Sequence, residues 1–176
     1  MHQFRLTKYD PAHRDCQGAY LREEWTSSAQ IGRSFGGVVL TEAEVQRVEE
    51  AYAISAVEFL REAGVVSLTV TGLENPRGLE LPFSEGTSLA LEEVAGVLRR
   101  VLREEFWCRL EGEQAFVHID WDYYLFLGVP IPCPAAEAAA LRRGLFPEPF
   151  PSPHLQPGPA DQDGGLPSEI PPGSSP

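Results

Sequence analysis

Residues 106 to 129 read FWCRLEGEQAFVHIDWDYYLFLGV and form the densest apolar and aromatic run in the chain. The run predicts a β-hairpin, with a first strand over 106–110, a polar turn over 111–114 and a long second strand. Successive side chains of a strand point to opposite faces. One face of the second strand is therefore expected to be a core face, made by Val117, Ile119, Trp121, Tyr123, Leu125 and Leu127.

The opposite face of this strand would carry the only His/Asp cluster of the chain, together with Phe116, Tyr124 and Phe126. An imidazole and two carboxylates, from His118, Asp120 and Asp122, could hold a divalent metal or perform acid–base chemistry. Same-face neighbours on a strand lie about 6.7 Å apart, however, which is poor geometry for closing on one ion. The alternative is a polar sheet face open to solvent. We therefore predict no metal and no cofactor.

Two amphipathic helices are expected to cover the core face. The sequence TEAE at residues 41–44 is a capping box that starts the first helix, which Gly64 ends. Its apolar residues fall three and four apart, as do those of a second helix over about 89–105. Strands over 3–9 and 65–73 complete a β-α-β-α-β-β order. This order predicts an α+β two-layer sandwich, with two helices on one face of a roughly four-stranded mixed sheet.

The C-terminal part changes character after the hairpin. Prolines at positions 130, 132 and 134 end the last strand, and a short helix is expected over 135–143. From residue 147 onwards Pro, Gly, Ser and acidic residues dominate, a composition typical of disorder. The sequence thus predicts a single domain over 1–146 and a disordered tail over 147–176.

The loop between the first strand and the first helix is rich in charged and aromatic side chains. Binding residues concentrate on such loops, so Tyr9, Asp10, Arg14 and Trp25 are binding candidates beside His118, Asp120, Asp122 and Tyr124. The alternative is a compact surface loop held in place by its own aromatic residues, with Arg14 paired to a carboxylate.

Charge limits the partners that the protein can bind. The net charge is −12, and the tail after residue 146 holds four acidic residues and no basic one. This leaves 14 basic and 22 acidic residues, a net charge of −8, on the domain. Such a surface opposes nucleic-acid binding, which depends on Lys and Arg, and suits either a basic protein partner or simple solubility. No apolar segment has the length of a membrane span or a signal peptide, so a cytoplasmic location is expected.

Residues 5 to 27 follow the pattern RLTKYDPxxRDxxGAYxxxEWTS. This pattern, with LREEFWCRL at 102–110 and DYY at 122–124, resembles an uncharacterised family of small bacterial proteins. The resemblance covers residues 1 to about 129. It implies no activity and no functional residue.

The sequence carries no motif that specifies a reaction. No G-x-S-x-G nucleophile elbow, P-loop or dinucleotide-binding pattern is present, and the three cysteines lack metal-binding spacing. We therefore expect a non-enzymatic protein-binding module, immunity- or inhibitor-like, that masks a basic partner. The alternative is a small metal-dependent hydrolase or a small-ligand-binding domain that uses the His118, Asp120 and Asp122 face.

Overall fold

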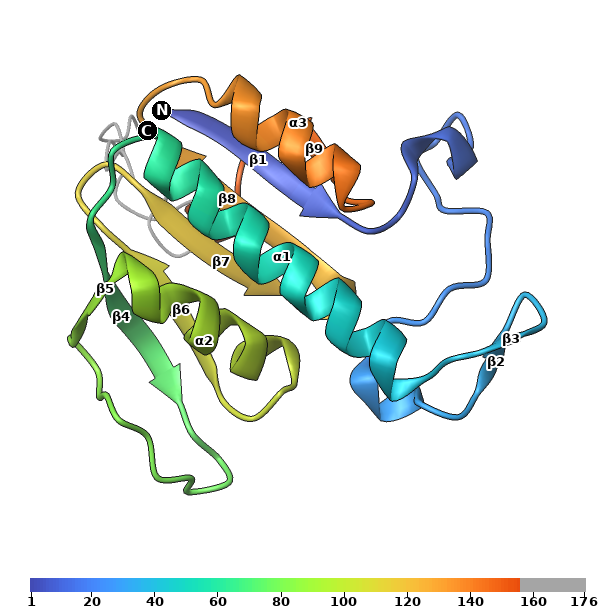
Figure 1. Ribbon diagram of the computed structural model, residues 1–176, viewed down its shortest axis with the longest axis horizontal. Coiled ribbons are helices and arrows are strands. Elements are labelled where there is room, and N and C mark those ends of the chain that lie inside the picture. Colours follow the sequence, from blue (N-terminus) through green and yellow to red (C-terminus); the bar gives the residue numbers. More distant parts are fainter. Residues whose placement is uncertain (156–176) are drawn as a thin grey trace, which may run out of the picture.

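The centre of the fold is a seven-stranded sheet, seen in a computed structural model that describes residues 1 to 155 (Figure 1). The spatial order of the strands is β5-β4-β6-β7-β8-β1-β9, and every pairing is antiparallel. The strands are β1 (His2–Thr7), β4 (Ser67–Glu74), β5 (Ser88–Ala90), β6 (Trp107–Glu111), β7 (Phe116–Asp120), β8 (Tyr124–Val129) and β9 (Phe146–Pro149).

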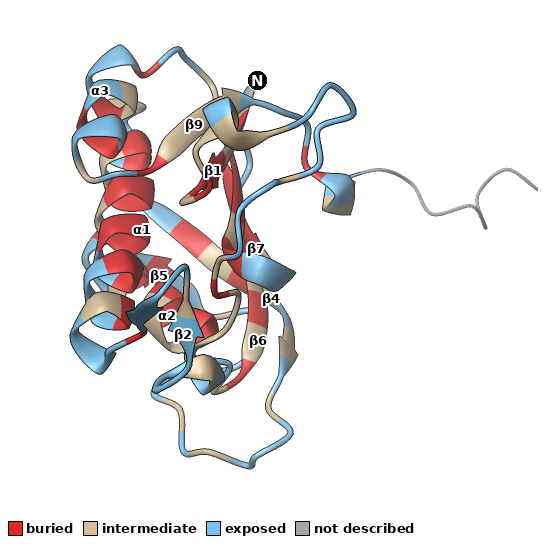
Figure 2. Cartoon of the chain, turned by 90° about the vertical axis from the view of Figure 1, so that its right-hand side faces the viewer, coloured by how far each residue is buried: buried red, intermediate tan, exposed pale blue. Residues whose placement is uncertain are grey.

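Three helices cover one face of this sheet, so the protein is an α+β two-layer sandwich (Figure 2). They are α1 (Glu42–Glu62), α2 (Leu91–Leu102) and α3 (Pro134–Arg142). A separate two-stranded hairpin precedes α1 and consists of β2 (Ser34–Phe35) and β3 (Val38–Val39). Four short 3-10 turns complete the described elements, at Pro11–His13, Ser28–Gln30, Trp121–Tyr123 and Pro153–Leu155.

Helix α1 forms where the sequence predicted it, because its signals are local. The Thr41 hydroxyl accepts a hydrogen bond from the Glu44 backbone N–H at 3.2 Å, and Gly64 takes the left-handed conformation, with φ 73°, just after the helix. The expected apolar stripe faces the sheet and is almost fully buried, as shown by Val45, Val48, Tyr52, Ala56 and Phe59.

The predicted sheet is wrong in strand number and direction. It has seven strands rather than about four, and it is antiparallel rather than mixed. Part of the difference arises within residues 106–129, which make three strands rather than two. The chain turns at Trp121–Tyr123, so that Asp120 of β7 pairs with Tyr124 of β8. Trp121 and Tyr123 are bulky strand formers, and Asp122 is the one turn-forming residue among the three.

The turn also changes which side chains reach the core. Val117, Ile119, Tyr123, Leu125 and Leu127 are buried, as predicted. Trp121 is not: 73% of its surface is exposed, and its assignment to the core face is wrong. The alternation that places side chains on a strand stops where the strand stops.

The C-terminal boundary also lies later than predicted. Residues 147–149 continue β9, which pairs with β1 at the sheet edge, and residues 150–155 cross the face opposite the helices. The prediction of disorder is therefore wrong for residues 147–155. Glu148 explains this order, because both Arg5 and Arg14 bind its carboxylate. The predicted disorder of residues 156–176 lies outside the described residues.

None of the helices within residues 1–155 combines the length and the hydrophobicity that crossing a bilayer requires.

Candidate functional site

Two adjoining cavities flank a pair of stacked tryptophans at the end of β7. Their volumes are about 270 and 410 Å³. Trp107, Trp121, Glu104 and Asp120 line both cavities. We refer to the two cavities together as the tryptophan cleft.

The two tryptophans come from a strand and from the turn that follows the neighbouring strand of the same sheet. Trp107 begins β6, and Trp121 lies in the turn after β7. Their ring centroids are 5.8 Å apart and the rings are inclined by only 18°, so they stack. Trp107 is half-buried, and Trp121 covers it while leaving most of its own surface to solvent. A large aromatic surface of this kind is a common anchor for protein partners.

Buried contacts beneath the turn hold Trp121 outside the core. The Asp120 carboxylate accepts a hydrogen bond from the Trp121 backbone N–H at 2.8 Å, which starts the turn. Tyr123 points inward, stacks edge-on against Trp25 at 4.8 Å and donates its hydroxyl to Glu49 at 3.2 Å. Tyr123 is thus directed into the core, while Trp121, two residues earlier in the same turn, faces outward because the turn interrupts the strand alternation.

Two further tyrosines fix the backbone of the same turn. The Tyr9 hydroxyl donates to the carbonyl oxygen of Asp122 at 2.8 Å, and the Tyr52 hydroxyl donates to that of Tyr123. Burial raises the pKa of both Tyr9 and Tyr52, so each remains a neutral donor. The turn is thus anchored to the segment just after β1 and to α1 by neutral hydrogen bonds inside the core.

The cleft also concentrates unusual backbone conformations. In the described part of the chain, only three non-glycine residues have positive φ: Glu104 at 55°, Asp122 at 61° and Tyr123 at 60°. All three line the smaller cavity. Such conformations cost of the order of 1–3 kcal/mol each and gather at binding and catalytic sites. The residues with strained backbone therefore line the same cavity as the exposed Trp121.

The cleft is acidic as well as aromatic. Glu74, Glu104, Asp120 and Asp122 contribute carboxylates, and neither Lys nor Arg is among the lining residues of either cavity. Ser27 orients Glu104 by donating its hydroxyl to the Glu104 carboxylate at 2.8 Å. Carboxylates beside an exposed indole ring attract cations by charge and by cation–π interaction.

His118 lies on the opposite face of the sheet from the helices and has no exposed surface. Its Nδ1 is 2.9 Å from the Ser152 hydroxyl, and its Nε2 is 3.2 Å from a Glu111 carboxylate oxygen. Burial lowers its pKa to about 4, against the opposing effect of Glu111. The Ser–His–Glu order resembles a hydrolase triad, but Ser152 is only 1% exposed and no substrate can reach its hydroxyl. The three residues fasten the C-terminal segment to the sheet.

The other two members of the predicted cluster do not join His118. Asp120 lies next to His154, whose Nε2 is 3.7 Å from its carboxylate, and Asp122 belongs to the turn and is exposed. Within residues 1–155, no group of three or more His, Cys, Asp or Glu side chains is arranged to hold a metal ion. The cluster is thus divided between the back of the sheet and the tryptophan cleft.

The candidates from the N-terminal loop hold structure together. Asp10 caps a short turn by accepting the Ala12 backbone N–H at 2.9 Å, and Arg14 binds Glu148 at 3.1 Å. Trp25 is buried against Tyr123.

Tyr124 is half-buried, and Tyr9 and Arg5 both contact its ring, the Arg5 guanidinium at 5.1 Å from the centroid. These contacts match the alternative of a compact loop held by aromatic residues.

Sequence reasoning missed Trp107, Trp121 and Glu104 as functional candidates. The one signal of a functional site in the sequence was Trp121, a large aromatic residue that lies between two aspartates. Both a strand and a turn are compatible with the sequence at this position. Glu104 gave no signal, because its position beside the tryptophans depends on how α2 leads into β6.

Comparison of the chain with models of protein families, with curated proteins and with solved structures gave no match. The resemblance of residues 5–27 to a family of small bacterial proteins therefore remains a prediction.

Proposed function

We propose that the protein is a non-enzymatic binding module whose tryptophan cleft receives a basic segment of a partner protein. One observation carries this proposal. The most exposed aromatic side chain of the described chain, Trp121, stacks on Trp107 among four carboxylates, with no Lys or Arg lining either cavity.

The physical basis is complementarity of both charge and shape. An arginine or lysine of the partner can lay its aliphatic stem or guanidinium on the exposed indole of Trp121 while Asp122 or Glu104 pairs with its charge. The net charge of −12 adds a long-range attraction that speeds the encounter and weakens as salt is added. The turn needs no rearrangement, because Tyr9 and Tyr52 already hold its backbone.

A binding role also agrees with the environment of His118. Its hydrogen-bonded partner Ser152 belongs to the C-terminal segment and is buried against the sheet, so this triad-like contact supports folding rather than attack on a substrate. A finer form of the proposal is an immunity- or inhibitor-like role, in which the acidic module neutralises a basic protein such as a nuclease toxin.

Titration calorimetry with a short arginine- and lysine-rich peptide tests the proposal, with a glutamate-rich peptide of equal length as the blank. We expect Trp121→Ala to weaken binding of the basic peptide about tenfold or more, equivalent to about 1.4 kcal/mol. The matched control is Leu21→Ala, which removes an equally exposed apolar side chain outside the cleft. This control should bind like the wild type.

The charge contribution needs its own pair of variants. Glu104→Gln combined with Asp122→Asn should weaken binding and flatten its dependence on salt. Glu92→Gln combined with Glu113→Gln removes the same charge from exposed positions outside the cleft and should have a smaller effect. Equal binding of both peptides, or wild-type affinity in Trp121→Ala, would refute the proposal. Inhibition of a basic nuclease by the wild type but not by Trp121→Ala would support the finer form.

A further inference from the structure

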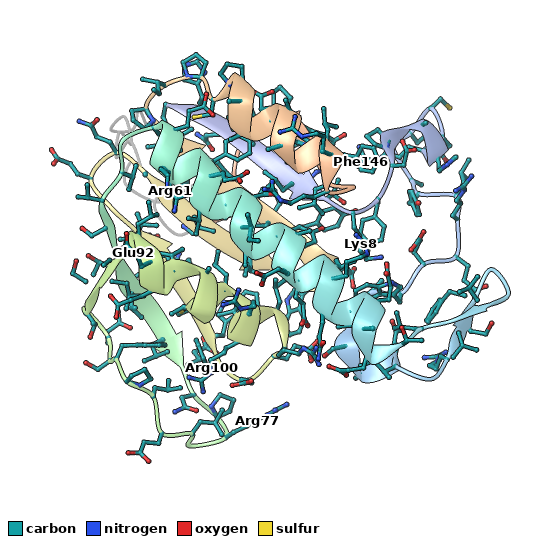
Figure 3. The ribbon with its side chains drawn as sticks, in the orientation of Figure 1. Lys8, Arg61, Arg77, Glu92, Arg100 and Phe146 are labelled. Carbon is teal, nitrogen blue, oxygen red and sulfur yellow. The ribbon has the colours of Figure 1, made fainter. Side chains whose placement is uncertain are left out.

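A cavity of different character lies on the helical side of the molecule, beside the only lysine of the chain. Its volume is about 170 Å³, and it opens between the end of β1, the N-terminal half of α1 and the turn after α3. Lys8, Arg47 and Arg143 line it together with Glu24 and Glu44. Figure 3 shows Lys8 beside α1 and near Phe146. In a chain of net charge −12, this cavity has more cationic than anionic lining side chains.

The Lys8 ammonium is buried and only partly compensated. Its side chain is 6% exposed, and its Nζ lies 4.2 Å and 4.3 Å from the ring centroids of Tyr9 and Trp25. Its one hydrogen-bond acceptor within residues 1–155 is Glu24, at 3.3 Å. Burial lowers the Lys8 pKa to about 8, although Glu24, Glu44 and Asp122 all favour the charged form. The ammonium therefore has less negative charge around it than its burial demands.

Both arginines have N–H donors that meet no acceptor among the described residues. Arg47 binds Glu44 through Nε and Nη2 and the Arg143 carbonyl through Nη1, and Arg143 binds Glu58 through Nη1 and Nη2. A guanidinium has five N–H donors and an ammonium has three. Among the described residues, Arg47 therefore has two donors without an acceptor, Arg143 has three and Lys8 has two. Guanidinium groups with free donors are the usual ligands of carboxylates and phosphates.

We propose that this cavity is a binding site for a small oxyanion, either a phosphate or a short dicarboxylate, held by Lys8, Arg47 and Arg143. The size fits: at about 30 Å³ for each water, the cavity has the volume of about five or six water molecules. Glu24 and Glu44 repel an anion, so the ligand must contact at least two of the three cations at once. This site is separate from the tryptophan cleft and does not depend on the function proposed there.

The single lysine makes the test direct. Labelling lysine alone with ¹³C and ¹⁵N places one side-chain signal in the NMR spectrum, that of Lys8. Inorganic phosphate and malonate are titrated separately, with chloride at matched ionic strength as the blank. We expect a saturable shift of the Lys8 signal with at least one of the two oxyanions, and a rise in the Lys8 pKa at saturation, because a bound anion favours the ammonium. The two titrations distinguish a phosphate site from a carboxylate site.

A pair of arginine variants gives the control. Arg47→Gln removes one proposed ligand and should weaken the saturable binding about tenfold, the cost of losing a charge-assisted hydrogen bond. Arg99→Gln removes the same charge from a surface ion pair with Glu50, outside the cavity, and should leave binding unchanged. Shifts that grow linearly and match those in chloride, or equal losses in the two variants, would overturn the proposal.

Discussion

At residue scale, the environment of His118 favours a neutral imidazole. Phe116 stacks on the ring with centroids 4.5 Å apart. The Ser152 hydroxyl and the Glu111 carboxylate each lie within hydrogen-bond distance of one ring nitrogen. Burial, assisted by the neighbouring His154, lowers the folded-state pKa from 6.5 to about 4. A protonated His118 is therefore better accommodated in the unfolded chain than in the folded one.

This difference predicts how stability depends on pH. Between pH 6.5 and 4 the unfolded state binds a proton at His118 that the folded state does not. The contribution of the neutral imidazole to the free energy of unfolding is therefore complete above pH 6.5 and is lost as the pH falls towards 4. Urea unfolding at pH 7 and pH 5 measures this loss. We expect His118→Phe to reduce it markedly and His2→Gln, at an exposed position, to retain it. An unchanged loss in His118→Phe would contradict the assignment.

At the scale of elements, close packing between adjacent strands explains a glycine in β8. Gly128 pairs with Phe116 of β7 on one side and Gln3 of β1 on the other. A Cβ at position 128 would overlap the Phe116 ring and lie 2.8 Å from the sulfur of Met1. The position therefore requires glycine for lack of space, since it does not have positive φ.

Gly128→Ala should destabilise the protein by about 1–3 kcal/mol, the usual cost of overpacking a core. Gly96→Ala is the matched control, because its Cβ would meet nothing within 4 Å and alanine favours a helix by about 0.5–1 kcal/mol over glycine. The midpoint of denaturant unfolding should thus fall for Gly128→Ala and rise for Gly96→Ala. Adding Phe116→Leu to Gly128→Ala should recover part of the loss, and strictly additive effects would exclude the steric explanation.

At the scale of the whole molecule, residues 146–155 pack against the N-terminal strand and the central strands of the sheet. Strand β9 pairs with β1, Glu148 binds Arg5 and Arg14, and Phe150 packs against Phe126. Strand β9 thus extends the sheet edge, and residues 150–155 cover part of the face that the helices leave open (Figure 2).

Truncation measures this contribution. A chain that ends after Leu145 should lose about 2 kcal/mol or more of its free energy of unfolding, because Phe126 and His118 lose their cover and two arginines lose Glu148. A chain that ends after Leu155 keeps every contact described above and is the control. Equal unfolding midpoints of the two truncated chains would show that the segment adds nothing to stability.

The sequence predicted those parts of the fold that depend on local pattern. Helix α1 follows from Thr41, Gly64 and an apolar stripe, and the core face of β7 and β8 follows from alternation at Val117, Ile119 and Leu125. The order of residues 147–155 could not be predicted in this way. Their composition is typical of disorder, and their order depends on contacts with Arg5, Arg14 and His118 far away in the chain.

The sequence by itself determined the α+β class, the acidic charge and the apolar face of the central strands, because periodicity and composition act over neighbouring residues. Tertiary structure alone decided that the chain turns at Trp121, that this ring stacks on Trp107 and that Glu104 lies beside it. The physical reason is that Tyr123 is drawn into a core built by α1 and the N-terminal loop, where Glu49 and Trp25 receive it. Tyr123 is therefore buried, and Trp121, two residues before it in the turn, stays exposed and lines the cleft.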